Sequence, residues 1–334
     1  MKDKFIGYYW SDDDYANEVW ENGTLVVDTN VLLDIYRVSP ETSDDLIKVL
    51  KMYAEKDRLW LPYQVAQEYH EELYPVVYSQ MGNFDEAYGC LKEFKAKINE
   101  KRNHPFLNEE QCQDIEEMLN NIKRIFDEQQ DKLKQSIKND SLKTKIADIF
   151  KRRVGEELSE DDLQKIHEEG QQRYEKTVPP GYKDKNKSDD KKYGDLIVWK
   201  QIMSYAKENQ RHVIFVSSDT KEDWYLKENS QTITPHPCLF KEFAAETGKH
   251  ILIYSLELFL KIVKSKNVIE IKDGTIDEME KVMKQVYDML GRFSDINEAT
   301  GNDSNVTNNF ILQKKMSEDV SETGNNTGST AGNS

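Results

Sequence analysis

The sequence predicts an α/β protein in which a doubly wound parallel sheet is interrupted by a helical insertion. Three observations support this fold class. Four short apolar segments have the composition of buried strands, each is followed by a helical pattern, and a long charged helical stretch separates the second segment from the third. Strands that alternate with helices along a chain are typical of parallel sheets covered on both faces.

The four predicted strands are short and mostly apolar. Three of them are rich in β-branched residues, whereas the second has none. Continuous apolar runs of this length are typical of parallel strands that are buried on both faces. The predicted strands are Thr24–Val27, Arg58–Leu61, Val213–Val216 and Ile251–Tyr254.

Each predicted strand is followed by a helical pattern with a recognisable start. Ser39 and Pro40 form an N-cap and first-turn pair for a helix that runs to about Ala54. Pro62 ends the second strand. The other predicted helices are Tyr63–Leu73, Gly194–Ala206, Leu256–Val263 and, after the last strand, about Ile276–Leu290.

The stretch between the second and third strands reads as a helical insertion. It is charged and poor in β-branched residues, and its apolar residues recur at spacings of three and four, as in Ile115, Leu119, Ile122 and Phe126. We expect a long antiparallel pair or a small bundle, followed by a loop at 178–192. The expected organisation is a first domain part at 1–75, the insertion at 76–175, a second domain part at 176–265, a helical extension at 266–294 and a disordered tail at 295–334.

Composition limits the environment and the partners. Three well-separated cysteines without metal-ligand spacing are typical of reduced thiols, and neither a signal segment nor a membrane-spanning stretch is evident, so a cytoplasmic protein is expected. The net charge of −16 argues against a nucleic-acid partner. Carboxylates that hold metal ions count as negative only until the metal binds, however, and lysines are concentrated between Lys183 and Lys192.

Acidic residues follow the strands at the edge where open parallel sheets bind ligands. Asp28 directly follows the first strand, and Asp219 and Asp223 follow the third. Glu68 and Asp195 lie near the starts of two helices and could point back to the same edge. Clustered carboxylates are unfavourable without a cation, and ligation by oxygen alone favours Mg²⁺ or Mn²⁺ over zinc.

These motifs together resemble the PIN-domain nucleases. The resemblance rests on a strand ending in Asp28-Thr29-Asn30, an acidic helix with Glu68, the Gly194-Asp195 helix opening and the Ser217-Ser218-Asp219 strand end. The Pro-Pro-Gly-Tyr-Lys-Asp segment at 179–184 and the Lys-Glu-Asp-Trp segment at 221–224 are similar to a larger bacterial PIN-like group with a helical insertion. The resemblance covers roughly residues 20–75 and 178–262.

The resemblance implies metal-dependent hydrolysis of phosphodiester bonds, with RNA favoured over DNA. It implies the metal ligands Asp28, Glu68, Asp195, Asp219 and Asp223, of which all but Asp223 are also catalytic candidates. Thr29, Asn30 and Ser217 would orient carboxylates or bind phosphate, and Lys183 and Lys185 would contact the substrate backbone. Asp184 is either a helper acid or a loop residue.

Several alternatives stay open at this point. Asp28, Asn30 and Asp219 could be turn or cap residues, Glu68 a solvated helix residue, and the lysine run a solvated loop. The chain could be an inactive PIN-like scaffold that binds a protein partner or a second copy through its insertion. A phosphohydrolase with an aspartate nucleophile is disfavoured, because that chemistry needs a second Asp at position 30, where this chain has Asn.

Overall fold

The computed structural model describes residues 1, 4–11, 13–100, 107–188, 191–228 and 231–282. The chain divides into two compact units. The first comprises residues 1–68 and the described residues from 149 onward, and the second comprises Tyr69–Asp148. Each unit is described separately.

The first unit is built on a four-stranded parallel sheet in the order β2-β1-β3-β6. Three strands have the bounds that the sequence predicts, namely β1 (Thr24–Val27), β3 (Val213–Val216) and β6 (Ile251–Tyr254). Val27 pairs with Val216, and Val216 pairs with Tyr254, so these three strands end at the same level. The carboxyl ends of the strands therefore form one continuous edge.

The second strand, β2 (Leu59–Trp60), is shorter than the predicted Arg58–Leu61. Leu61 instead forms an isolated parallel bridge with Val154, and its carbonyl accepts a hydrogen bond from Gly155 at 2.9 Å. The segment lacks β-branched residues, and Pro62 has no N–H to donate to a neighbouring strand. Only a short stretch therefore continues the regular ladder.

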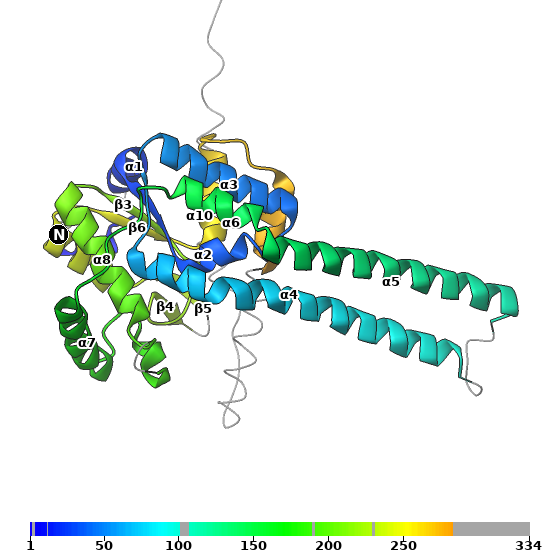
Figure 1. Cartoon of the computed structure of the whole chain (residues 1–334). Helices are drawn as coiled ribbons and strands as arrows, with labels where there is room; N and C mark the ends of the chain where they lie inside the picture. The colour runs from blue at the N-terminus through cyan, green and yellow to red at the C-terminus, as the bar shows by residue number, and fades with distance from the viewer. Residues whose placement is uncertain (2–3, 12, 101–106, 189–190, 229–230, 283–334) are drawn as a thin grey trace, which may run out of the picture. The chain divides into compact units, whose positions relative to one another are not determined.

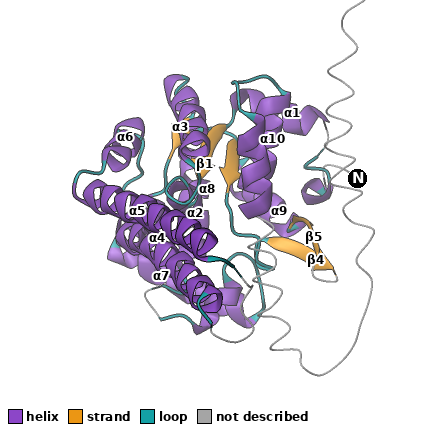
Figure 2. Ribbon diagram, turned by 90° about the vertical axis from the view of Figure 1, so that its right-hand side faces the viewer, coloured by secondary structure: helices purple, strands orange, loops and turns teal. Residues whose placement is uncertain are grey.

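Helices pack in layers around this sheet (Figures 1 and 2). In one layer Trp20 stacks on Phe259, with 5.7 Å between the ring centroids, and in the other Trp199 packs against Phe243 at 5.9 Å. Large aromatic side chains thus fill the space between neighbouring helices. The first layer contains α1 (Asp13–Asn22), α3 (Pro40–Glu55) and α10 (Leu256–Ser265), and the second contains α8 (Gly194–Asn209) and α9 (Pro237–Thr247).

The predicted helix starts are confirmed where a cap can be read from the sequence. The Ser39 side chain accepts a hydrogen bond from the Thr42 backbone N–H at 3.3 Å, and Pro40 is the first residue of α3. Glu278 binds the same helix start, because its carboxylate accepts from the Ser39 N–H and from the Thr42 hydroxyl. The negative charge of Glu278 at the start of α3 complements the positive end of the helix dipole.

The second unit is an antiparallel helical hairpin, in line with the predicted helical insertion. Phe84 meets Phe126 at 5.8 Å between centroids, and Gln130 donates to Asp85 at 3.2 Å. Its helices are α4 (Tyr63–Ile98), which begins in the first unit and contains Pro75, α5 (Glu109–Lys138) and α6 (Ser141–Ile149). The unit ends earlier than the expected 76–175 insertion, because α7 (Glu160–Glu175) packs with α8 and belongs to the first unit.

Several elements were not foreseen from the sequence. They are η2 (Ile6–Tyr8), α1, α2 (Thr29–Asp34), η3 (Tyr182–Asn186), β4 (Tyr225–Glu228), β5 (Gln231–Pro235) and α9. A further helix is described at 273–282, which overlaps the start of the predicted 276–290 helix. The rest of that helix and the predicted tail at 295–334 lie outside the described residues. Within the described chain, no helix combines the length and the apolar character needed to cross a bilayer.

Candidate functional site

Asp28 lies at the carboxyl end of β1, beside the end of the neighbouring strand β3. Its backbone N–H donates to the Val216 carbonyl at 2.9 Å, which fixes the two strand ends together. Its carboxylate accepts from the Ser217 hydroxyl at 2.6 Å and from the Thr29 backbone N–H at 2.8 Å. Asp28 is thus the N-cap of α2, and Ser217 orients its carboxylate. Asp28 is therefore both the N-cap of α2 and a candidate site acid.

Glu68 lies in the second turn of α4 and faces the same edge. Its carboxylate accepts from the Thr29 hydroxyl at 2.8 Å and from the Gln64 amide at 2.9 Å. A β-carbon added at Gly194, the first residue of α8, would lie only 2.8 Å from Glu68 Oε1. The Glu68 carboxylate therefore occupies the space in front of the α8 N-terminus, where negative charge is favourable.

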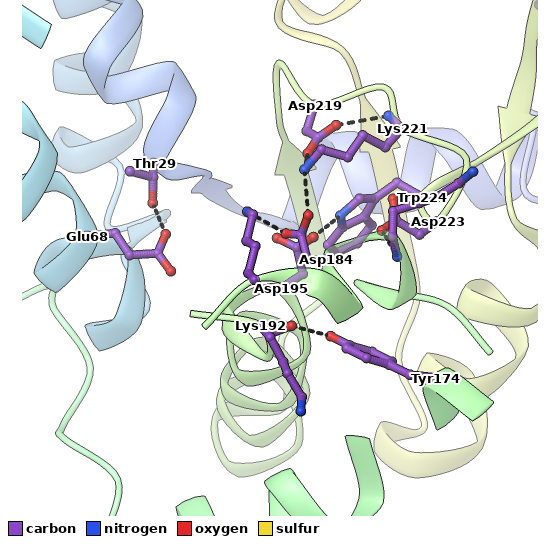
Figure 3. A network of polar contacts seen from close by, with 12 residues as sticks. Thr29, Glu68, Tyr174, Asp184, Lys192, Asp195, Asp219, Lys221, Asp223 and Trp224 are labelled. Carbon is purple, nitrogen blue, oxygen red and sulfur yellow. Dashed lines mark hydrogen bonds and ion pairs between the residues drawn. The ribbon is translucent and has the colours of Figure 1, made fainter. Parts of the chain in front are cut away.

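Asp195 is the second residue of α8. The Trp224 indole N–H donates to its carboxylate at 3.3 Å (Figure 3). Burial raises its pKa well above the usual range, and the negative charge of Asp219 raises it further, while Lys221 acts in the opposite direction. The charge of Asp219 therefore makes ionisation of Asp195 more costly.

Asp219 and Asp223 lie in the loop that follows β3. Asp219 accepts from the Lys221 backbone N–H at 2.9 Å, and its other oxygen lies 2.7 Å from the Lys221 ammonium. Asp223 is completely buried. One of its oxygens accepts from the Lys183 backbone N–H at 3.0 Å, and the other has no hydrogen-bond partner among the described residues.

The carboxylates repel one another across this edge. Burial raises the pKa of Asp28 to about 6, Glu68 and Asp219 raise it in addition, and the Ser217 hydrogen bond opposes the shift. Burial also raises the pKa of Asp223 to about 6, with Asp219 as the next cause. Such clustering of carboxylates in a fold is unfavourable unless positive charge is supplied.

The other predicted site residues occupy three different settings. Asn30 is half-buried in the first turn of α2, two residues after Asp28. The Lys183 ammonium forms an ion pair with Glu222, and Lys183 reaches the acids through its backbone N–H to Asp223. Lys185 is exposed in η3. Both lysine side chains are exposed, and Lys183 contacts a candidate acid through its backbone N–H.

Two contributors, Lys221 and Asp34, are absent from the site residues that the sequence predicts. Lys221 binds both Asp219 and the buried Asp184, for which the sequence offers two interpretations, a helper acid or a loop residue. Asp34 accepts from the Ser218 hydroxyl at 2.7 Å and so anchors the loop after β3 to α2. Lys221 stands in the Lys-Glu-Asp-Trp segment that carried the resemblance, so its position was visible. Its partners were not, because they depend on the path of the loop.

The donor set fits a hard divalent cation. All five acids supply oxygen, the ligand type that Mg²⁺ and Mn²⁺ prefer, and Asp223 keeps a buried oxygen that no described group satisfies. As arranged, no three Asp, Glu, His or Cys side chains of the described chain converge closely enough to hold one ion. Asp219 is instead paired with Lys221, and Asp195 accepts from Trp224.

A parallel sheet with acids along one edge, on a chain interrupted by a helical hairpin, defines a nuclease-type fold of the PIN-like class. The sequence model of the PIN-like domain family matches residues 24–239. The chain belongs to this family, as its motifs predict. Domains of this family are commonly nucleases, generally bind nucleic acids and generally use divalent metals. Neither the curated proteins nor the solved structures contain a significant match.

Proposed function

We propose that this chain is a metal-dependent endonuclease that hydrolyses phosphodiester bonds, with RNA as its preferred substrate. The observation that supports the proposal is the raised pKa of Asp28, Asp195 and Asp223, which burial and the charges of neighbouring acids cause beside the carboxyl ends of β1 and β3. A fold retains such a costly arrangement where a function requires it.

Asp28, Glu68 and Asp195 would hold one divalent ion, and Asp219 with Asp223 would complete a second position or orient its water ligands. When bound, such an ion lowers the pKa of water and stabilises charge on the departing oxygen. The protein's own contribution is orientation. Ser217 and Thr29 fix the carboxylates of Asp28 and Glu68, so that little reorganisation is needed when substrate binds.

Three residues outside the set of acids, Asn30, Lys183 and Lys185, would position the nucleic acid. Lys185 is exposed and Asn30 is half-buried in the first turn of α2, and we assign both to contacts with phosphate oxygens. Lys183 is already paired with Glu222, and its contribution requires that this ion pair opens. The preference for RNA comes from the resemblance to the PIN-domain nucleases.

The test is cleavage of labelled single-stranded RNA, single-stranded DNA and duplex with Mg²⁺, Mn²⁺ or EDTA. We expect RNA to be cut only with metal, and Asp28→Asn and Asp195→Asn to lower the rate by roughly a hundredfold or more. Asp161→Asn is the matched control, because Asp161 is likewise an acid in the first turn of a helix but is exposed on α7. Its rate should equal that of the wild type.

Two results would contradict the proposal. Cleavage that persists in EDTA, or in both site variants, would place the chemistry elsewhere. A folded protein that binds Mn²⁺ but cuts none of the three substrates would favour an inactive scaffold that acts through the helical hairpin.

A further inference from the structure

Lys221 is a cation that contacts the candidate acid Asp219. Its ammonium lies 2.7 Å from Asp219 Oδ2 and 3.5 Å from Asp184 Oδ1 (Figure 3). About a third of the side chain is exposed. Burial lowers the pKa of Lys221, but the charges of Asp219, Asp195 and Asp184 outweigh this effect and raise it. The ammonium is thus held by several carboxylates at once.

Asp184 offers Lys221 a second partner that lies outside the five predicted ligands. Asp184 is buried, its backbone N–H donates to the Gly181 carbonyl at 3.0 Å, and its Oδ2 lies 2.7 Å from the Lys187 ammonium. Its other oxygen faces Lys221. Asp184 is therefore fixed in place, whereas Lys221 has a flexible four-carbon stem and can shift between two carboxylates.

A divalent ion bound by Asp219 would compete with this ammonium for the same oxygen. An ion that binds Asp219 would lie beside the Lys221 ammonium, and like charges at such separation repel strongly in a partly buried site. The same ammonium, which lies 2.7 Å from Asp219 Oδ2, offsets the negative charge of this carboxylate while no metal is bound. Lys221 would thus stabilise the site without metal and oppose the binding of metal.

We propose that Lys221 is a tethered counter-ion that neutralises Asp219 in the metal-free chain and moves onto Asp184 when metal binds. The exchange sets the metal concentration at which the site loads. Lys221 and Asp184 are positioning residues in this scheme, and neither needs to touch the substrate. The inference rests on the proposed metal-dependent function.

The test is the affinity for Mn²⁺ itself, measured by titration calorimetry on the full chain without substrate. Lys221→Met should lower the Kd by about tenfold, because it removes the competing charge. Asp184→Asn should raise the Kd, because Lys221 then has nowhere else to move. In the double variant Asp184→Asn should have almost no further effect, since its role acts through Lys221.

Lys261→Met is the matched control. Lys261 is equally half-buried, with 32% of its side chain exposed against 34% for Lys221, and it also lies between two carboxylates, those of Glu257 and Glu280. These carboxylates are not among the candidate ligands, so Mn²⁺ affinity should not change. Thermal unfolding in EDTA shows whether each variant is folded, and we expect Lys221→Met to unfold at a lower temperature than the wild type.

The outcomes separate the inference from the proposed function. Equal or weaker Mn²⁺ binding by a folded Lys221→Met variant overturns the counter-ion role while the nuclease proposal stands. An equal effect of Asp184→Asn in both backgrounds shows that Asp184 acts directly, and overturns the exchange. Absence of Mn²⁺ binding by the wild type and by Lys221→Met overturns the metal-dependent function together with the inference.

Discussion

At the scale of single residues, the candidate site combines a structural and a chemical role in the same side chain. Asp28 caps α2, binds Ser217 and lies among the acids. Thr29 begins α2 and donates to Glu68. Hydrogen bonds to a carboxylate favour its ionised form, whereas burial and neighbouring acids favour the protonated form. The balance differs from one acid to the next, and Asp223 has no exposed surface.

Asp223→Asn should therefore stabilise the metal-free protein at neutral pH. The folded-state pKa of Asp223 is about 6, above the value near 3.8 that an unfolded aspartate has, so ionisation costs stability as pH rises through this window. At pH 7.5 in EDTA we expect the variant to gain on the order of 1–2 kcal/mol. The amide can still accept from the Lys183 N–H.

Thermal unfolding at pH 7.5 and at pH 4 checks this prediction. The advantage of the variant should shrink at pH 4, where Asp223 of the wild type is largely protonated in the fold. Saturating Mn²⁺ should reverse the order at pH 7.5, because only the wild type keeps the full set of acids for the ion. A variant that is less stable than the wild type in EDTA at pH 7.5 would show that the Asp223 charge is compensated within the fold.

At the scale of elements, the start of α8 is shaped by its neighbour Glu68. Gly194→Ala would normally favour a helix, but here the new β-carbon would lie 2.8 Å from Glu68 Oε1. The carboxylate is the far end of a flexible side chain, so it should turn away and leave the fold intact. Displacement of a site acid by about 1 Å costs on the order of tenfold to a hundredfold in rate.

The measurement is the RNA cleavage rate together with the unfolding temperature. Gly194→Ala should cut more slowly at an unchanged or higher unfolding temperature. Gly82→Ala in α4 is the control, because a β-carbon there meets nothing within 4 Å and changes only the helix propensity. If Gly194→Ala cleaves as fast as the wild type, the observed position of the Glu68 carboxylate is not required for cleavage.

The order of elements explains which parts of the site were predictable. Apolar runs bounded by turn residues located three strands to the residue, and parallel strands bring their carboxyl ends to one edge, so Asp28 and Asp219 could be placed near each other. The Gly-Asp opening of α8 placed Asp195 in the same way. The period of a helix places Glu68 once its start at Tyr63 is known.

The remaining contacts depend on tertiary structure, which periodicity does not encode. The hairpin of β4 and β5 alternates weakly, with Leu226 and Ile233 exposed, so it lacked a strand signal. The pairing of Lys221 with Asp184 joins the loop after β3 to η3, and the two residues are 37 positions apart in sequence. Loop paths of this kind are fixed by packing and hydrogen bonds, such as that between Ser218 and Asp34, rather than by local propensity.

At the scale of the whole molecule, the candidate acids would bind metal, whereas the net negative charge of the chain opposes binding to nucleic acid. The net charge of −16 opposes non-specific binding to a polyanion, and among the loop lysines the ammonium groups of Lys183 and Lys187 are already paired with Glu222 and Asp184. A nuclease with this charge would act on substrate that is positioned by metal and by a few contacts. A long basic surface would not be needed.

The helical hairpin carries none of the candidate acids, so its outer part should be dispensable for the chemistry. All five lie in the compact unit formed by residues 1–68 and the described residues from 149 onward. Replacing residues 88–123 by a short Gly-Asn turn would keep the Phe84–Phe126 contact and the Asp85–Gln130 hydrogen bond. We expect the Kd for Mn²⁺ and the kcat on a short RNA to stay within about twofold of the wild type.

The same shortened chain distinguishes between the two candidate functions of this protein, a nuclease and an inactive scaffold. If the protein is a nuclease, cleavage should persist and disappear again when Asp28→Asn is added to the shortened chain. If it is an inactive scaffold, the shortened chain should lose a partner that the full chain retains, and neither form should cut RNA. Loss of cleavage by a shortened chain that unfolds at the wild-type temperature and binds Mn²⁺ normally would give the hairpin a direct part in holding the substrate, since the fold and the metal site would both be intact.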